Sequence, residues 1–436
     1  MKSICFVSNF EKTEFFLKIS KKIPNRKVFW ICVNLKEFRQ INKYFDEAQI
    51  LYLKKSELTK KNINSNFKIN ELLFADRSLK VSNNADKNFL INSETIITDF
   101  IKSNNINFIF SEFTWAHEIL INLICKKNPE LNCKHYNPGA VRIIPDRFLF
   151  FESLDNSKYY LRKDNPTSLL SINEKYYREF IKSHTVQKKI FNIKFILRKL
   201  FKLFYDDYFD NNDPRRISRF TRIQKFVFKY FNFIIFNLIT KKKIDELKNL
   251  KFVIYYLQKK PEANTDVKGI YYSDHLTNIQ NIWKILPPGF QLLVKQHPSC
   301  TGDNNLFYYK KIRSFQDVFL LDELSDNLFE KIKPIATFSI NSTASMETAL
   351  NKIPSFTFAD CFFNELKFCR KIFLDDFKKY DLFDFVDILK KDNKNKKDNS
   401  DLDFLKSTYP GYIYGEHLLE DENIQKIVNS INDIIS

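Results

Sequence analysis

The segments LLVKQHP, Leu292–Pro298, and ATFSINSTASMETALNKIPSFTF, Ala336–Phe358, decide the predicted fold of this chain. In each segment a short run of apolar residues stops abruptly at polar side chains, Lys-Gln-His in the first and Asn-Ser-Thr in the second. Buried strands of parallel sheets are short apolar runs, and ligands bind in α/β sheets beyond the carboxyl ends of such strands. Both segments therefore predict strands of one sheet with a ligand site at its edge.

Short apolar runs alternate with amphipathic stretches on both sides of a long basic segment, which is typical of parallel sheets with crossover helices. In the later part, we expect strands at Phe252–Leu257, Gln291–Lys295, Val318–Leu321, Ile335–Ser339 and Ser355–Phe358, and helices at Ser273–Ile285 and Ser345–Asn351. In the earlier part, we expect strands at Ser3–Ser8, Lys27–Val33, Ile50–Leu53, Phe108–Ser111 and Cys133–Tyr136, and helices at Glu11–Lys22, Lys36–Phe45, Ser93–Ser103 and Trp115–Lys127. Because single cores stop growing at about 250 to 300 residues, we predict two α/β lobes, 1–157 and 251–420, and a final helix, 421–436, that crosses back to the first.

The segment between the lobes, 158–250, is basic and has helical periodicity. Residues 186–250 contain 16 Lys/Arg and 6 Asp/Glu. The resulting net charge of +10, which is 16 minus 6, is more than half of the formal net charge of +18 for the whole chain. One amphipathic helix is predicted over 190–204. A second helix places Phe220, Ile223, Val227, Phe231, Ile234 and Leu238 opposite Arg215, Arg219, Arg222, Lys225 and Lys229.

Basic amphipathic helices with bulky apolar faces lie in the interface of anionic membranes. We therefore assign Arg215, Arg219 and Arg222 to membrane or acceptor contact. The alternative is a helix pair that packs on the protein and leaves a basic face in solvent.

The remaining composition favours a cytoplasmic protein held peripherally at an inner membrane. Seven cysteines without CxxC spacing indicate reduced thiols rather than a zinc site or a disulfide framework. The longest apolar stretch, Phe231–Thr240, is about half of the roughly 20 residues that a membrane-spanning helix needs, and the N-terminal residues lack a signal-peptide pattern.

Two side chains at the end of the Leu292–Pro298 segment are candidates for contact with a phosphate. The His297 imidazole can donate a hydrogen bond to a phosphate oxygen, and Lys295 adds positive charge nearby. A lone histidine is more often a satisfied structural group, but the predicted position at a strand end favours the ligand-binding role.

The Ala336–Phe358 segment predicts a helix that begins in a hydroxyl-rich turn containing Ser342 and Thr343, with Ser345 and Glu347 in its first turns. Free N–H groups and the dipole at a helix start favour an anion, so the turn can hold a nucleotide phosphate while Glu347 binds ribose. The alternative role is capping, with Ser342 or Thr343 as the cap and Glu347 as a first-turn charge, and both roles are compatible.

A third strand–loop segment, VIYYLQKKPEANTD, Val253–Asp266, carries Gln258 and Glu262 beyond its apolar run. If this loop opens into a cleft between the lobes, these two side chains can contact the sugar or base of a donor.

The order LQxxPE, a helix, VKQHP and S-T-x-S-x-E-x-A-L-x-x-I-P across Phe252–Phe358 resembles the second lobe of bacterial capsule and lipopolysaccharide glycosyltransferases. Within that class it is similar to the group that includes β-Kdo transferases and, more distantly, to bacterial sialyl- and polysialyltransferases. The resemblance implies a GT-B fold of two Rossmann-like lobes, with the donor on the second, the acceptor on the first, no essential metal and no cofactor. It also implies that His297, Ser342 and Thr343 contact the donor phosphate, and that Glu347 is the helix carboxylate of the family.

Glycosyl transfer needs a base for the acceptor hydroxyl, or a carboxylate nucleophile if a covalent intermediate forms. Glu112, after the predicted strand Phe108–Ser111, is the first candidate and Asp146 is the second, although either can equally be an ordinary loop or capping carboxylate. Arg142 and Arg147 flank Asp146 and can hold an acidic sugar or a lipid-linked phosphate.

The sequence therefore predicts a glycosyltransferase that moves a sugar from a CMP- or UDP-linked donor, with CMP-Kdo favoured, to a glycan or lipid-linked acceptor of capsule or lipopolysaccharide. One alternative is a UDP-sugar 2-epimerase of similar fold, which has no need of a membrane. The other is a non-enzymatic basic protein that binds membranes or nucleic acid; no nucleic-acid motif accompanies the charge, so nucleic acid is not an expected partner.

Overall fold

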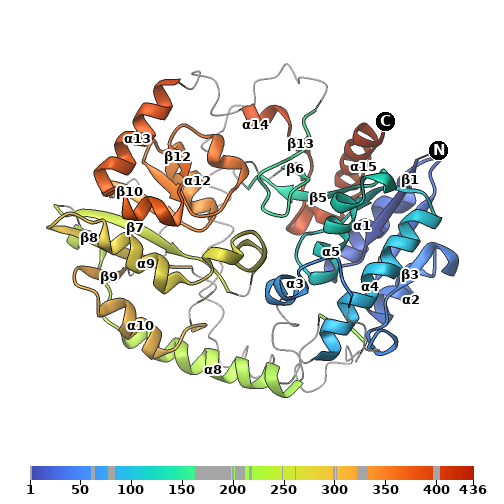
Figure 1. The fold of residues 1–436 in the computed structure, drawn as a ribbon, viewed down its shortest axis with the longest axis horizontal. Coiled ribbons are helices and arrows are strands. Elements are labelled where there is room, and N and C mark those ends of the chain that lie inside the picture. The colour runs from blue at the N-terminus through green and yellow to red at the C-terminus, as the bar shows by residue number, and fades with distance from the viewer. Residues whose placement is uncertain are drawn as a thin grey trace.

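The computed structural model describes residues 2–59, 64–76, 84–142, 144, 146–162, 198, 201, 212–215, 219–247, 249–260, 262–297, 300, 302–321, 332–395 and 403–436. These residues form two α/β lobes, each built on its own sheet, that lie side by side (Figure 1). The predicted helix over 190–204 falls almost entirely outside the described residues, as does Pro298.

The first lobe has a seven-stranded sheet in the order β13-β6-β5-β4-β1-β2-β3. Strands β1 to β5 are parallel to one another, whereas β6 is antiparallel to β5 and β13 is antiparallel to β6. The strands are β1 (Ser3–Val7), β2 (Val28–Cys32), β3 (Ile50–Tyr52), β4 (Ile106–Phe110), β5 (Lys134–Ala140), β6 (Arg147–Phe151) and β13 (Tyr409–Pro410). The helices are α1 (Glu11–Lys22), α2 (Leu35–Ile41), α3 (Ile69–Ala75), α4 (Asn84–Ser103), α5 (Ala116–Lys127) and α15 (Asp421–Ile435).

Helices cover both faces of this sheet, so its central strands are apolar on both sides. All residues of β1 and β2 are buried. On one face the Phe6 ring packs against Phe16, Trp30 and Phe110, with ring centroids 5.4 to 5.7 Å apart. This double burial explains why the parallel strands could be predicted as unbroken apolar runs.

The second lobe has a six-stranded, fully parallel sheet in the order β12-β11-β10-β7-β8-β9. The strands are β7 (Lys251–Leu257), β8 (Phe290–Gln296), β9 (Val318–Leu321), β10 (Ala336–Ser339), β11 (Ser355–Thr357) and β12 (Cys369–Lys371). The helices are α9 (His275–Lys284), α10 (Leu306–Arg313), α12 (Thr343–Leu350), α13 (Leu382–Asn395) and α14 (Asp403–Lys406). The predicted strands and helices of this lobe are confirmed within two residues at each end.

The chain returns to the first lobe at β13, earlier than the residue 421 expected from the sequence. Gly411 has a φ of 136°, and a Cβ there would lie 2.5 Å from Ile427 of α15, so only glycine fits this corner. Helix α15 then packs along α1, and Lys18 Nζ donates to the Leu419 carbonyl at 2.9 Å. Two Rossmann-like lobes joined by such a returning helix form a GT-B architecture.

The basic segment contributes helix α8 (Arg219–Leu238), which confirms the second amphipathic helix predicted from the sequence. Figure 1 shows α8 along the lower edge of the molecule, and its C-terminal end packs into the second lobe at Phe236. No helix in the described part of the chain is long and apolar enough to cross a bilayer.

Candidate active site

A cavity of about 330 Å³ lies between the two lobes, where the carboxyl ends of strands from both sheets meet. The first lobe contributes residues that follow β1, β4 and β5, and the second contributes residues that follow β7, β10 and β11. Its polar lining includes Asn9, Glu112, Thr114, Asn137, Arg142, Asp155, Asn156, Glu262, Asn264, Lys268, Asn341, Thr343 and Tyr414. The cavity therefore occupies the position at which doubly wound sheets bind ligands.

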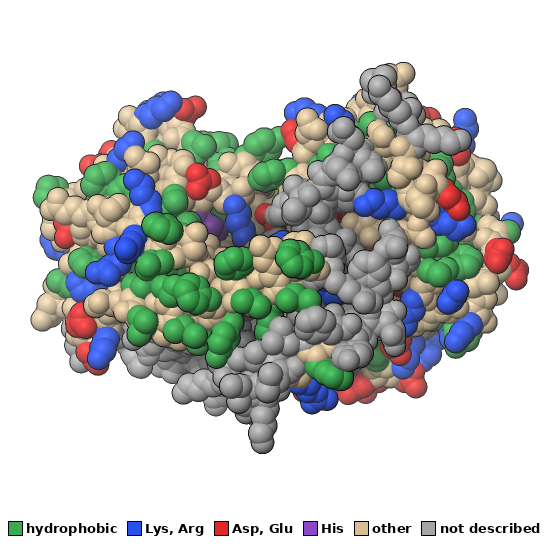
Figure 2. Space-filling model, turned by 90° about the horizontal axis from the view of Figure 1, so that it is seen from below, with side chains coloured by type: hydrophobic (Ala, Val, Ile, Leu, Met, Phe, Trp, Pro, Cys, Tyr) green, Lys and Arg blue, Asp and Glu red, His purple; other side chains and the backbone are tan. Residues whose placement is uncertain are grey.

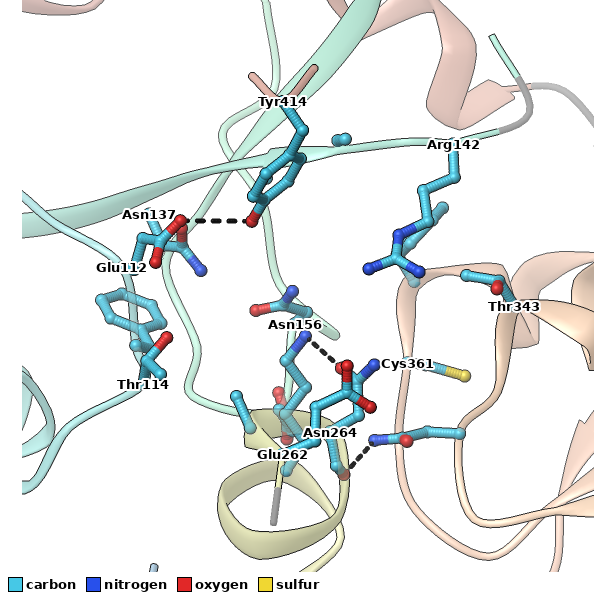
Figure 3. Close-up of a pocket in the computed structure, with 18 of the residues that line it drawn as sticks. Glu112, Thr114, Asn137, Arg142, Asn156, Glu262, Asn264, Thr343, Cys361 and Tyr414 are labelled. Atoms are coloured by element: carbon cyan, nitrogen blue, oxygen red, sulfur yellow. Dashed lines mark hydrogen bonds between the residues drawn. The ribbon is translucent and has the colours of Figure 1, made fainter. Parts of the chain in front are cut away.

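One end of the cavity, which we call the carboxylate end, consists of Asn9, Glu112 and Tyr414 (Figure 3). The Tyr414 hydroxyl donates to Glu112 Oε1 at 3.2 Å, and Asn9 Nδ2 donates to Glu112 Oε2 at 3.1 Å. The nearby Glu112 carboxylate raises the pKa of Tyr414, so the phenol remains a donor. Both oxygens of Glu112 are thus held in place at the cavity wall.

Two charged side chains behind this wall support it. Glu118 is fully buried and accepts from Asn9 Nδ2 at 3.2 Å and from two backbone N–H groups at the start of α5. Burial, and then the Glu112 charge, raise the pKa of Glu118. Lys12 lies 3.9 Å from Glu112 Oε1 and 4.1 Å from the centre of the Tyr414 ring, and its Nζ also donates to the Ile413 carbonyl. The returning chain is therefore fixed directly against Glu112.

The opposite end, which we call the cation end, consists of Arg142, Lys268 and Thr343. Arg142 lies in the turn between β5 and β6 with a φ of 68°, a conformation that costs a non-glycine residue of order 1 kcal/mol and is common at functional sites. Figure 3 shows its guanidinium pointing into the cavity between Tyr414 and Thr343.

Lys268 closes a short helical turn, Asn264–Lys268, and its Nζ donates to Asn264 Oδ1 at 2.8 Å. Burial, and then the Arg142 charge, lower the pKa of Lys268 to about 8, while Glu262 opposes the shift. The positive charges of Arg142 and Lys268 therefore repel each other. An anion bound near both would relieve this repulsion.

A chain of buried hydrogen bonds holds the second-lobe turn that carries Thr343. Gln258 makes two 2.9 Å bonds with Asn341, donating to its side-chain oxygen and accepting from its backbone N–H. His275 lies between the Tyr255 hydroxyl, at 2.6 Å from Nδ1, and the Gln258 carbonyl, at 3.2 Å from Nε2. Asn341 in turn donates to the Asn264 carbonyl at 3.0 Å, so the turns after β7 and β10 form one unit.

Several predicted donor contacts belong to this support and do not line the cavity. Ser345 is fully buried with its hydroxyl 2.7 Å from that of Ser339, the side-chain amide of Gln258 bonds to Asn341 through both its nitrogen and its oxygen, and neither residue lines the cavity. Ser342 caps α12, accepting from Ala344 N at 3.2 Å. Of the predicted donor residues, Glu262 and Thr343 line the cavity.

Lys295 and Glu347 both lie near Tyr256. Lys295 Nζ is 6.0 Å from the centre of the Tyr256 ring, and the charge of Glu347 contributes to a raised pKa of Tyr256, after burial. Neither residue is among those that line the cavity.

His297 follows β8, which is separated from β10 by β7, so it is not on a strand next to the Thr343 turn. Its side chain is exposed and is not part of the cavity lining, although it is within electrostatic reach of the cavity. The pKa of His297 is lowered, chiefly because the surrounding protein partly desolvates the residue; Glu262 opposes the shift, and the charges of Lys259, Arg142 and Lys295 add to it. The predicted convergence of His297 with the hydroxyl-rich turn in one pocket is therefore not what the structure shows.

Of the first-lobe candidates, Glu112 and Arg142 line the cavity, whereas Asp146 and Arg147 do not. Arg147 begins β6, where burial lowers its pKa and the nearby charge of Asp146 opposes that shift. Asp146, the second candidate for the catalytic base, therefore lies next to Arg147 and outside the cavity lining.

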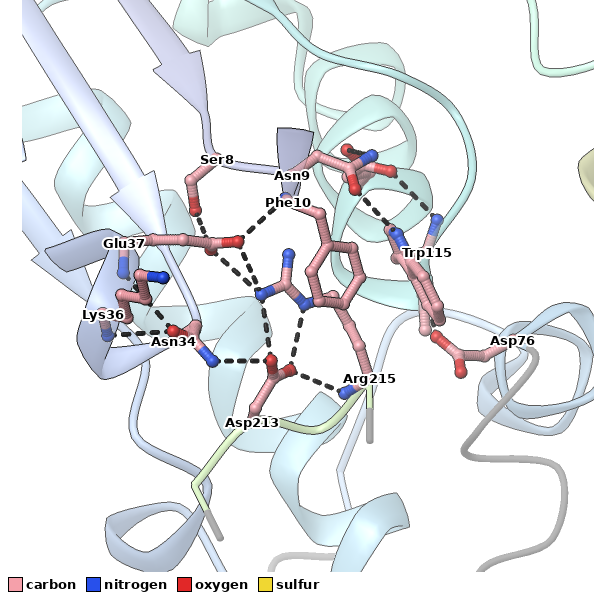
Figure 4. Close-up of polar contacts among 12 residues, drawn as sticks. Ser8, Asn9, Phe10, Asn34, Lys36, Glu37, Asp76, Trp115, Asp213 and Arg215 are labelled. Atoms are coloured by element: carbon pink, nitrogen blue, oxygen red, sulfur yellow. Dashed lines mark hydrogen bonds and ion pairs between the residues drawn. The ribbon is translucent and has the colours of Figure 1, made fainter. Parts of the chain in front are cut away.

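Arg215 is buried in the first lobe and is not a membrane contact, which corrects the sequence-based assignment (Figure 4). Its guanidinium donates to Asp213 at 2.9 and 3.0 Å and to both Glu37 oxygens at 2.9 and 3.0 Å. Burial alone would lower the pKa of Arg215, but the Glu37 and Asp213 carboxylates raise it. Burial alone would raise the pKa of Asp213, but Arg215 lowers it. A helical wheel could not reveal this ion pair, because Glu37 is remote in sequence.

This buried cluster also fixes Phe10, a cavity residue with a φ of 44°. The Phe10 N–H donates to Glu37 at 2.8 Å, and its ring lies 4.0 Å from the Arg215 guanidinium carbon and 5.7 Å from the Trp115 ring. Arg215 therefore supports the cavity wall from behind. Arg222 lies half-buried on α8, and Arg219 begins that helix, but its side chain is outside the described part.

The sequence did not single out Asn9, Lys268, Asn341 or Tyr414 as site residues. Asn9 and Asn341 each follow a predicted strand closely, so their position was a usable signal. Tyr414 reaches Glu112 across more than 300 residues, and local pattern carries no information about such a contact.

No family model matches the chain, and no curated protein sequence matches it. Among solved structures, it is similar to KpsC, a β-Kdo 2,7 transferase from Thermosulfurimonas dismutans, with 9% identity, a TM-score of 0.39 and full coverage of both chains. It is also similar to a putative UDP-N-acetylglucosamine 2-epimerase from Listeria monocytogenes, with 9% identity, a TM-score of 0.30 and coverage of 100% of this chain and 97% of that one. A UDP-GlcNAc 2-epimerase from Neisseria meningitidis, solved with UDP-GlcNAc, has 11% identity, a TM-score of 0.29 and 99% coverage of both chains. These scores do not distinguish transferase from epimerase.

Proposed function

We propose that this protein is a glycosyltransferase that moves a sugar from a nucleotide donor to an acceptor hydroxyl inside the interlobe cavity. The observation that carries the proposal is the polarity of that cavity, with the held carboxylate of Glu112 at one end and the cations Arg142 and Lys268 at the other. Glycosyl transfer needs a proton acceptor on one side of the reacting carbon and stabilisation of a leaving phosphate on the other.

In the proposed reaction, the bond between the anomeric carbon and the phosphate oxygen breaks, and the acceptor oxygen forms a new bond to that carbon. The negative charge left on the nucleotide is stabilised by Arg142, Lys268 and the Thr343 hydroxyl. Glu112 takes the proton of the acceptor hydroxyl, while Asn9 and Tyr414 keep its oxygens oriented. Because these side chains supply the charge, the proposal includes no resident metal or organic cofactor.

For the donor we propose a CMP-linked ulosonic acid such as CMP-Kdo. Such a donor carries two anionic groups, the phosphate diester and the sugar carboxylate, and the cation end offers two cations that influence each other. The proposed acceptor is a capsule or lipopolysaccharide glycan, free or lipid-linked, at the cytoplasmic face of the inner membrane.

The test is to incubate the protein with CMP-Kdo, UDP-GlcNAc and GDP-mannose, each with and without glycan acceptors, and to follow released nucleotide and product mass. Acceptor-dependent release of a nucleotide, lost in Glu112→Gln and kept in the exposed control Glu130→Gln, is the expected result. Conversion of UDP-GlcNAc to a 2-epimer without acceptor would overturn the proposal in favour of an epimerase.

A further inference from the structure

Helix α8 is firmly attached to the second lobe along one side. Phe236 is buried in the second-lobe core, with its ring 4.9 Å from that of Tyr309 on α10. Lys229 pairs with Asp303 at 2.6 Å. A Cβ on Gly302, which has a φ of 87°, would lie 2.2 Å from the Lys229 carbonyl, so the helix backbone approaches this turn as closely as glycine allows.

The other side of α8 carries large apolar side chains in solvent. Six large apolar residues of α8 are between 47% and 81% exposed, and we call them the apolar stripe: Phe220, Val227, Phe228, Phe231, Ile234 and Leu238. Phe307, at the start of α10, is a further 77% exposed ring. Figure 2 shows apolar side chains gathered along this face of the molecule. Single exposed apolar residues are ordinary, but a row of them marks an interaction surface.

The sequence-based alternative, a helix packed by its apolar face with a basic face in solvent, does not fit this arrangement. The packed side is formed by Phe236 with the partly buried Phe226, Tyr230 and Phe233, and the predicted apolar face is the one left outside. Only Ile223 of that face is partly buried. Helix α8 therefore carries apolar side chains on two sides, and only one of these sides packs against the protein.

Charge indicates which partner covers the stripe. Lys225 is exposed on the same helix, Arg222 is half-exposed, and the surrounding segment holds most of the excess positive charge of the chain. A second copy docked about a two-fold axis would bring two helices of like positive charge together, which is unfavourable. An anionic bilayer instead offers phosphates to the cations and acyl chains to the rings.

We infer that the apolar stripe of α8 inserts into the interface of an anionic phospholipid bilayer and that the positive charge of α8 and its surrounding segment attracts the lipid phosphates. The helix follows directly on the Asp213–Arg215 anchor in the first lobe and ends in the core of the second, so a docked α8 holds both lobes against the leaflet. Membrane contact by α8 does not depend on the proposed function. Only the link between this leaflet and the acceptor rests on it.

The experiment is co-sedimentation of the full chain, without donor, with phosphatidylcholine vesicles that either contain or lack phosphatidylglycerol. We expect binding to the anionic vesicles and at least tenfold weaker partitioning for the double variant Phe228→Ser/Phe231→Ser, because two exposed rings lose their burial in lipid. Phe373→Ser, which removes an exposed ring elsewhere on the second lobe, is the matched control and should bind like the unmodified chain. Lys225→Gln should weaken binding to anionic vesicles.

Two outcomes would overturn the inference. One is that the unmodified protein stays in the supernatant with anionic vesicles, or that the double variant sediments as well as the control. The other is a dimer in sedimentation velocity that the double variant converts to monomer, which would assign the stripe to a second copy. Vesicle binding by a protein that transfers no sugar would leave this inference standing and remove only the proposed function.

Discussion

The two ends of the interlobe cavity are built in different ways. At the carboxylate end, Glu112 is held by side chains from two distant parts of the chain, the stretch from the turn after β1 into helix α1 and the returning segment at Tyr414. At the cation end, Lys268 and Thr343 stand on turns linked by local and neighbouring-strand hydrogen bonds, and Arg142 reaches in from a strained hairpin. The difference suggests that the position of one carboxylate is critical, whereas anion binding is shared among several groups.

The largest expected effect follows from replacing Glu112. Glu112→Gln keeps the shape and both hydrogen-bonding neighbours but removes the proton acceptor, so we expect transfer to fall by about 10³-fold. The loss is measured as the steady-state rate of transfer at saturating donor, with Glu130→Gln as the control. A residual rate within tenfold of the unmodified enzyme would show that Glu112 does not carry the chemistry.

The next effect concerns the support behind the carboxylate end. Arg215→Met leaves Glu37 and Asp213 buried without their cation, and we expect a loss of about 3 kcal/mol in the free energy of unfolding. Denaturant unfolding measures it, with Arg313→Met as an exposed control. Adding Glu37→Gln should recover part of the loss; a change below about 0.5 kcal/mol for the single variant would mean that the cluster is not structural.

A smaller effect is expected at the cation end because the anion site is shared. Arg142→Gln should weaken donor binding by about 30-fold, near 2 kcal/mol, since hydrogen bonds to charged groups contribute about 1.5 to 3 kcal/mol. Calorimetric titration with the nucleotide measures the dissociation constant. If the affinity is unchanged, the phosphate does not bind between the cations.

The smallest effect is a pH dependence. Because the pKa of Lys268 is lowered to about 8, its charge is present below that pH and is lost as the pH rises. Donor affinity should therefore fall by up to about tenfold between about pH 7 and about pH 9. Lys268→Arg keeps its charge over this range and should flatten the profile; an identical slope in that variant would assign the titration to another group.

Much of the fold could be predicted because its strands are buried on both faces and appear as unbroken apolar runs. Several elements were not predicted, among them the short strands β12 and β13, which have three and two residues. Strand β6 was also missed, although its residues Phe148–Phe151 form a buried apolar run. Helix α4 begins at Asn84 rather than Ser93, and α2 ends at Ile41 rather than Phe45, because helix ends depend on caps and tertiary contacts.

The site was predicted less completely, for a physical reason that differs between residues. Glu112, Glu262 and Thr343 follow strands and do line the cavity, as their positions indicated. Gln258 and Ser345 also lie at strand ends or helix starts, but their polar groups are used by neighbours that pattern alone does not identify. Arg215 looked like a surface cation because its partners, Glu37 and Asp213, could not be placed beside it from the sequence.

The most direct measurement is a crystal structure of the protein with the nucleotide that raises its melting temperature most among CMP, UDP and GDP. The phosphate should lie within hydrogen-bonding distance of Arg142 or Lys268 and of Thr343, with the sugar side of the cavity facing Glu112. A nucleotide held instead at His297 and Lys295, outside the cavity, would contradict the assignment of this cavity as the transfer site.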